Sequence, residues 1–351
     1  MPRRMKHDLR VAMRELHRLI DAVQMNCDVA DARHAREATM CTYLLQMRER
    51  YCWEHELPLA VQPPREDLAR WLSAREAAWN ELEERAYEAL PLGARRCDPF
   101  DADAVNRDLL PLELVYGAGY GRFHRPHFFL AALERRDTRE GIEVLVAGCE
   151  YARDLVAAPA AFQGNTIYVR REALRRWLWD KVEFWRSRRN EGALARAIAT
   201  WGLEAGDAAG FERMVAAETE TLILHELGEA RAGGLLGARW EEMLAGLNEQ
   251  RAELLARAVR DNLADCLSTL PALLEREARA SIHFYFSQFD GLRRELFPAL
   301  AAGYREWRES GAAGSLRAAI ERGSAHWTSV ARDLLAHSVQ PVCAEAQALA
   351  L

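Results

Sequence analysis

The first quarter of the sequence lacks glycine, and the sequence as a whole lacks long apolar runs. Glycine is absent from residues 1–92 and proline from residues 3–57, so nothing interrupts a helical interpretation of this part. No apolar run approaches the roughly 18 residues of a membrane helix. The first residues also lack the apolar core of a signal peptide. These absences predict a cytoplasmic protein that does not enter a membrane.

The cysteines lack the pattern of a disulfide framework or of a zinc knuckle. They are odd in number, widely spread and without a Cys-x-x-Cys pair, and this pattern is typical of reduced thiols. The seven are Cys27, Cys41, Cys52, Cys97, Cys149, Cys266 and Cys343.

Neither sign of charge predominates, because the 351-residue chain contains 47 basic and 53 acidic residues. A net charge of −6 does not favour binding to nucleic acid through bulk charge. Arginines and aromatic residues alternate over residues 168–196, but acids lie among them at helical spacings, which is typical of surface ion pairs. We expect a small-molecule substrate and neither a membrane nor a nucleic acid as partner, while a homo-oligomer stays open.

What is present favours a mainly α fold, a helical bundle with a small β-hairpin insertion. Residues 1–92 read as a helical N-terminal unit whose expected helices cover 6–24, 28–54 and 65–89. Residues 93–170 are rich in loops. Within them, apolar runs at 127–133 and 142–147 flank a polar stretch and predict a hairpin, and 166–169 predicts a third short strand. Residues 171–351 return to helical patterning and are expected to form a bundle that carries the site.

The densest chemical signal lies between residues 218 and 229. Glu218, His225 and Glu229 stand seven and then four residues apart, so they project from one face of one helix. Carboxylates and an imidazole on one face are ligands for one or two metal ions. A solvated acidic face with a partly buried histidine is the alternative for such a short pattern.

A second group of the same kind lies near the end of the chain. His326, Asp333 and His337 are again seven and four residues apart, in a segment rich in apolar residues. His283 lies in an aromatic stretch with few charges, Ser281 to Asp290. Such a histidine is either a hydrogen-bonded core residue or a ligand. We expect Glu218, His225, Glu229, His283, Asp333 and His337 to be the metal ligands.

This pattern resembles the haem-oxygenase-like di-iron oxidases. The similarity rests on a carboxylate and a histidine seven residues apart on one helix, and on Asp-x3-His on a late helix. The resemblance implies a helical bundle with two irons that activate dioxygen to oxidise a small molecule. It assigns Glu218 and His225 to one iron and Asp333 and His337 to the other. A bridging carboxylate stays open among Glu253, Asp261 and Asp265.

A zinc-dependent hydrolase is the alternative enzyme. His225-Glu226-x-x-Glu229 is similar to the His-Glu-x-x-His helix, in which two ligands one turn apart hold zinc and the glutamate activates water. This alternative makes Glu226 the catalytic base and either His283 or His337 the third ligand. A third hypothesis is a helical binding or scaffold protein without catalysis, in which the paired charges stabilise the core.

Overall fold

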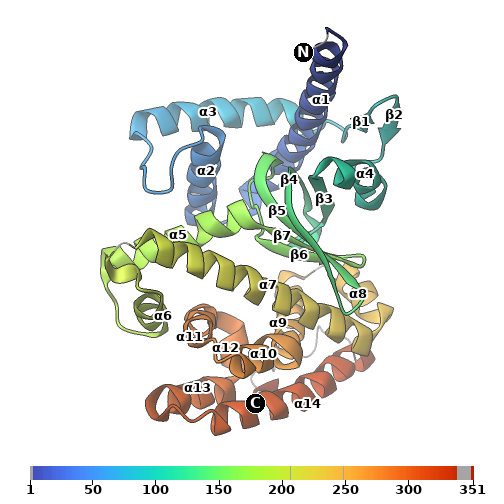
Figure 1. Cartoon of the computed structure of the whole chain (residues 1–351). Helices are drawn as coiled ribbons and strands as arrows, with labels where there is room; N and C mark the ends of the chain where they lie inside the picture. The colour runs from blue at the N-terminus through green and yellow to red at the C-terminus, as the bar shows by residue number, and fades with distance from the viewer. Residues whose placement is uncertain (1–2, 206, 248, 338–348) are drawn as a thin grey trace. The chain divides into compact units, whose positions relative to one another are not determined.

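The computed structural model describes residues 3–205, 207–247, 249–337 and 349–351, and Figure 1 shows their arrangement into helices and strands. The chain divides into two compact units. Unit 1 comprises residues 1–159 and 168–177, and unit 2 comprises residues 160–167 and 178–351. No described helix is long and apolar enough to cross a membrane.

Unit 1 combines helices with most of a five-stranded sheet, whose strand order is β3-β4-β5-β7-β6. Strands β3, β4 and β5 pair antiparallel, and β1 and β2 form a separate two-stranded sheet. The elements from the N-terminus to the end of the sheet are α1 (Arg3–His34), α2 (Met40–Glu54), α3 (Arg65–Leu82), β1 (Leu90–Leu92), β2 (Arg95–Cys97), α4 (Ala102–Leu109), β3 (Leu114–Tyr120), β4 (Pro126–Arg139), β5 (Ile142–Arg153), β6 (Ala160–Gln163) and β7 (Thr166–Arg170).

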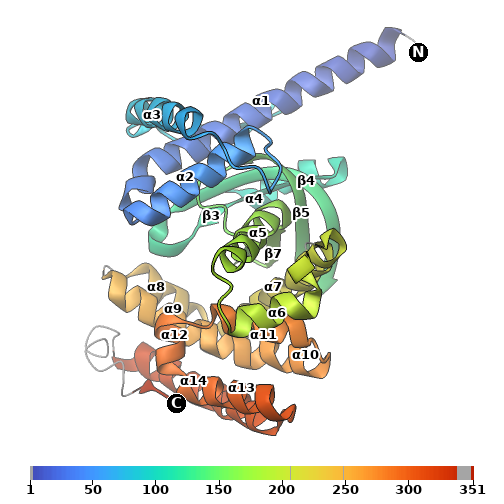
Figure 2. The same cartoon turned by 90° about the vertical axis from the view of Figure 1, so that its left-hand side faces the viewer.

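The core of unit 1 lies between α1 and the sheet. Leu19, Val23 and Cys27 recur on one face of α1 and pack with Phe128 and Leu130 of β4. Figure 2 shows α2 and α3 beside α1. The apolar stripe of the first helix therefore anchors the N-terminal helices to the strands.

The expected fold, a helical bundle with a small hairpin, is wrong because the sheet is much larger than a hairpin. The polar stretch read as a turn continues β4, where Arg136 pairs with Leu145 and Arg139 with Ile142. Leu114–Tyr120 is a strand, although its glycines resemble those of a loop. A Cβ at Gly117 would lie 2.1 Å from the ring of Phe129. A glycine inside a strand thus marks a close approach rather than a break.

Unit 2 is helical apart from residues 160–167, and the helix α5 (Arg171–Arg188) has its first residues in unit 1 and its remainder in unit 2. Its long helices α7, α9 and α14 contact one another, and α13 packs along α14 (Figure 1). The central core contains Trp240, Phe297 and Trp327. The elements are α6 (Ala193–Trp201), α7 (Ala208–Leu236), α8 (Ala238–Ala245), α9 (Gln250–Ala264), the π-helix η5 (Asp265–Thr269), α10 (Leu270–Glu275), α11 (Arg279–Gln288), α12 (Gly291–Leu296), α13 (Pro298–Ser310) and α14 (Gly314–His337).

Candidate metal centre

Helices α7 and α9 approach each other closely at Gly228. A Cβ at this position would lie 2.3 Å from the backbone oxygen of Ala264, so only glycine fits. On each of the two segments, one polar residue lies three positions before the crossing and a second polar residue lies one position after it. These four residues are His225 and Glu229 around Gly228, and Asp261 and Asp265 around Ala264.

The imidazole of His225 lies between two carboxylates. Its Nδ1 is 2.8 Å from Oδ1 of Asp265, and its Nε2 is 3.6 Å from Oε1 of Glu229. The side chain of His225 keeps 23% of its surface exposed, so the imidazole is mostly buried. A carboxylate on one ring nitrogen orients the other nitrogen toward a ligand, as in many metal sites.

Three donor atoms converge beside this ring. One ligand atom each from His225, Glu229 and Asp261 lies within 4.8 Å of the other two, and these three residues are the metal-ligand group found among the described residues. A nitrogen and two carboxylate oxygens suit zinc, iron or manganese. Ligands on one tetrahedral ion are about 3.4 Å apart when the bonds are about 2.1 Å, so the set needs only a small contraction.

Two arginines partly balance the acids. Arg260 donates to Glu229 Oε1 at 2.8 Å and lies 3.9 Å from Asp261. Arg293 contacts Asp265 from the other side and is joined there by the hydroxyl of Tyr285, which donates to Asp265 Oδ2 at 2.8 Å. Asp265 is therefore held by several donors and fixes the imidazole rather than facing solvent.

The charges of the cluster shift its pKa values in opposite directions. Burial alone would lower the pKa of His225, but Asp265 and Glu229 outweigh it and hold that pKa well above its usual value. Burial would raise the pKa of Glu229, yet Arg260 and His225 lower it to about 2. In the absence of an ion, the imidazolium and Arg260 thus supply positive charge between the carboxylates.

Glu226 is the acid of this cluster whose pKa is raised. Burial and the negative charge of Glu229 raise its pKa to about 8, although His225 and Arg260 act against this. Asp261 contributes to the rise as well. A carboxyl group that changes protonation near neutral pH beside a ligand set is suited to transfer protons.

A widened turn places Asp265. The segment Asp265–Thr269 is π-helical, and the N–H of Leu270 donates to the carbonyl of Asp265, five residues earlier. Pro271 explains the widening, because proline has no N–H and its ring clashes with the carbonyl four residues before it. That carbonyl, on Leu267, instead accepts from Nη1 of Arg231 at 2.6 Å. Such π-helical turns occur frequently at functional sites.

Glu218 lies on the same helix, about 10 Å from His225 along the axis, and is not part of the group formed by His225, Glu229 and Asp261. Glu218 is 4% exposed, and burial raises its pKa to about 8 against the opposing hydrogen bonds of Ser281 and Thr221. It is therefore a buried acid that holds its proton at neutral pH.

The remaining expected ligands lie in other surroundings. The Nδ1 atom of His283 is 2.9 Å from the hydroxyl of Tyr304, and its ring lies 5.1 Å from that of Trp307. Burial and nearby arginines lower the pKa of His283 to about 4. Asp333 is exposed on α14, while the side chain of His337 lies outside the described residues. His326 Nε2 contacts the carbonyl of Leu349 at 2.8 Å.

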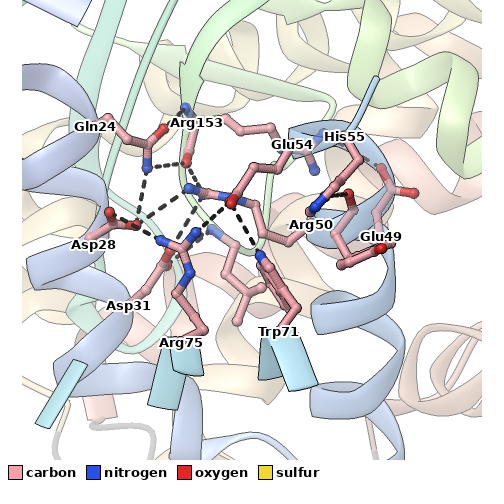
Figure 3. A network of polar contacts seen from close by, with 12 residues as sticks. Gln24, Asp28, Asp31, Glu49, Arg50, Glu54, His55, Trp71, Arg75 and Arg153 are labelled. Carbon is pink, nitrogen blue, oxygen red and sulfur yellow. Dashed lines mark hydrogen bonds and ion pairs between the residues drawn. The ribbon is translucent and has the colours of Figure 1, made fainter. Parts of the chain in front are cut away.

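Unit 1 holds a second buried charged cluster, most of which is shown in Figure 3. Arg50, only 1% exposed, lies 3.3 Å from Asp28 on α1 and 3.6 Å from Glu54 on its own helix. Arg75 of α3 donates to Glu54 at 2.5 Å. Deeper in the unit, Arg170 donates to Glu150 at 2.5 Å and Asp154 at 2.7 Å. Arg153 of β5 lies 3.5 Å from Glu49 of α2, so the network joins the N-terminal helices to the strands.

The sequence placed His225, Glu226 and Glu229 on one helix and left a bridging carboxylate open among Glu253, Asp261 and Asp265, of which Asp261 and Asp265 lie beside His225. It missed Arg260 and Arg293, which complete the charges of the cluster. It also missed the arginine network of unit 1. One signal was available: Arg260 stands directly before Asp261, and Arg293 follows the aromatic stretch that contains Tyr285.

Two family models match consecutive parts of the chain. The first is described as the N-terminal domain of a family of unknown function, DUF6866, and covers residues 18–170. The second is the C-terminal domain of the same family and covers residues 175–350. No curated protein and no solved structure matches the chain.

Proposed function

The chain belongs to the DUF6866 family, and we propose that it is a metal-dependent enzyme that holds one divalent ion in unit 2 and hydrolyses a small molecule. The observation that carries this proposal is the convergence of donor atoms from His225, Glu229 and Asp261 within 4.8 Å of one another. Three protein ligands that leave a coordination position open are typical of catalytic zinc.

Each residue of the cluster has a role in this proposal. Nε2 of His225 and one oxygen each of Glu229 and Asp261 bind the ion, and Asp265 orients the imidazole through Nδ1. The ion would lower the pKa of water and polarise the bond to be hydrolysed. In its carboxylate form, Glu226, whose pKa is about 8, would take a proton from the water and return it to the leaving group.

Arg260 has an alternative partner when an ion takes its place near Glu229. Its Nη1 already lies 3.7 Å from the exposed carboxylate of Glu241. Binding of the ion also requires His225 to lose the proton that its two carboxylates favour. We therefore expect the metal affinity to increase as the pH rises.

The oxidase hypothesis requires a second ion at Asp333 and His337. Asp333 is exposed, and the described residues supply three ligands for one ion rather than ligands for two. For this reason we place the one-ion hydrolase before the di-iron oxidase. The number of metal atoms per chain distinguishes the two.

The first test is elemental analysis of the purified protein, expressed with ample zinc, iron and manganese. We expect about one metal ion per chain in the wild type, and almost none in His225→Ala and Asp261→Asn. His17→Ala is the matched control, because His17 is exposed on α1. Equal metal content in the wild type and His225→Ala contradicts the proposal, and about two irons per chain favour the oxidase.

The second test separates binding of the ion from turnover. Glu226→Gln keeps all three proposed ligands, so it should retain the metal. It should also lose the metal-dependent hydrolysis of a panel of nitrophenyl esters and phosphates by about 100-fold or more. If the variant that retains the metal hydrolyses such a substrate as fast as the wild type does, Glu226 is not the base.

A further inference from the structure

Unit 2 contains a cavity of about 640 Å³ that the proposed metal centre does not use. It lies among the end of α5, the start of α6, α11 and α13. Aromatic side chains form much of its wall, including Trp185, Phe286 and Tyr304. The rings of Phe286 and Tyr304 are stacked, with centroids 4.0 Å apart. The volume is in the range of small-molecule sites.

The charges around this cavity are mostly positive. Four arginines line it, Arg188, Arg294, Arg305 and Arg308, against the single acid Glu191 among the described lining residues. Arg308 pairs with Glu309 at 2.8 Å. Arg294 and Arg305 are exposed, and their guanidinium groups have no carboxylate within 4.0 Å in the described part of the chain. An anion entering the cavity therefore meets cations that are not already neutralised.

The N-terminus of α6 adds to this positive side. Gly192, Ala193, Leu194 and Ala195 line the cavity, and the cap residue Gly192 has φ 144°, which favours glycine, and no capping side chain. The first hydrogen bond of the helix is donated by Arg196 to the carbonyl of Gly192. The preceding N–H groups have no acceptor among the described residues. Uncapped N–H groups at a helix start are a binding site for anionic oxygens.

The cavity thus combines aromatic surface, two arginines without a carboxylate partner among the described residues, and the N–H groups at the start of α6.

We propose that this cavity binds an organic phosphate that carries an aromatic ring. The phosphate oxygens contact the N-terminus of α6 and the guanidinium groups of Arg294 and Arg305, and the ring packs against Phe286 and Tyr304. Arginine suits this role because its planar donors match phosphate oxygens. The proposal rests on the cavity alone and is independent of the metal centre.

Calorimetric titration of the full chain with phenyl phosphate tests this site. We expect a dissociation constant of about 1 mM or tighter, as suits a ligand of this size. Inorganic phosphate lacks the ring and benzyl alcohol lacks the charge, so each should bind at least about tenfold more weakly. Benzoate tests whether a carboxylate replaces the phosphate.

Two variants link binding to the cavity. The double variant Arg294→Gln/Arg305→Gln should weaken the binding of phenyl phosphate at least about tenfold. Arg332→Gln changes an exposed arginine on α14 and should leave it unchanged. Ala301→Phe fills the cavity without altering charge and should abolish binding, with the thermal unfolding midpoint reporting that the variant is folded.

The proposal is overturned by any of four results. Phenyl phosphate binds the double variant as tightly as the wild type, benzyl alcohol binds as tightly as phenyl phosphate, or no binding is detected at ligand concentrations of about 10 mM. Binding that persists in Ala301→Phe places the phosphate elsewhere and also contradicts the proposal.

Discussion

The two buried charged clusters of this molecule differ in how their acids are paired. In unit 1 each acid of the network has an arginine within 4.0 Å, as Asp154 has Arg170 and Glu49 has Arg153. In unit 2, Glu226 is buried with no arginine within 4.0 Å among the residues that the structure describes, and an imidazole lies between two carboxylates. Arginines that match the acids produce a structural clamp. A cluster that leaves an acid unpaired beside an imidazole is suited to bind a cation.

The largest effect is expected from breaking the clamp. Arg170→Met leaves Glu150 and Asp154 buried without their closest cation and should lower the free energy of unfolding by about 3–5 kcal/mol. Urea unfolding followed by circular dichroism measures this loss. Arg95→Met is the control, because its pair with Asp108 is exposed and is worth at most about 1 kcal/mol. Equal stability of the two variants would show that the network is not a clamp.

The next largest effect concerns the crossing of α7 and α9 beside the candidate metal centre. Gly228→Ala forces a methyl group against the backbone oxygen of Ala264, so α7 and α9 must separate. We expect a loss of about 1–3 kcal/mol in stability, together with loss of the metal. Gly234→Ala is the matched control on the same helix, since a Cβ there meets nothing within 4 Å and should stabilise the helix by up to about 1 kcal/mol.

A smaller effect on metal affinity is expected when the changed residue is Asp265, which orients the imidazole, and not one of the proposed ligands. Asp265→Asn keeps the size of the side chain but weakens its hold on His225, so the metal affinity should fall by about 10- to 100-fold. Competition with a chelator measures the affinity. Asp333→Asn provides the comparison: it should have no effect on a one-ion centre, whereas a loss in this variant supports the di-iron hypothesis.

The smallest effect concerns the pH dependence of stability. Glu218 has a pKa of about 8 in the folded chain and about 4.3 when unfolded. The folded state therefore binds more protons, and stability falls as the pH rises through this window. Between pH 7 and 9 the metal-free wild type should lose about 1 kcal/mol more than Glu218→Gln. Parallel pH profiles of unfolding would instead show that Glu218 is already ionised at pH 7.

The helices were largely predictable from the sequence, but their ends were less so. The first helix was expected over 6–24 and extends over Arg3–His34. The second begins at Met40 with Thr39 as its cap, not near Asp28 or Asp31. Both aspartates lie within α1 and have partners far away in the sequence. Asp31 accepts a hydrogen bond from the backbone N–H of Leu155, and Asp28 pairs with Arg50. Local capping rules do not contain such a contact.

The sheet and half of the candidate metal centre depend on tertiary contacts that cannot be derived from the spacing of residues in the sequence. The polar end of β4 is stabilised by pairing with β5 rather than by an apolar pattern, so alternation alone missed it. Likewise, the His225 face of α7 was predictable from its helical period, but its partners came from a different helix. Among the eligible acids, Asp261 and Asp265 are selected by the crossing at Gly228. Only tertiary structure reveals that selection.

Pro271 influences the candidate metal centre, although it is not one of the proposed ligands. A helix interior normally excludes proline at a cost of about 3 kcal/mol, yet here its ring accounts for the widened turn that begins at Asp265. Replacing Pro271 with alanine would restore a donor to the carbonyl of Leu267 and allow the turn to tighten by one residue. The residues before it would then rotate by about 100° relative to α10, so the direction of Asp265 is set by a side chain without any polar atom, six residues away.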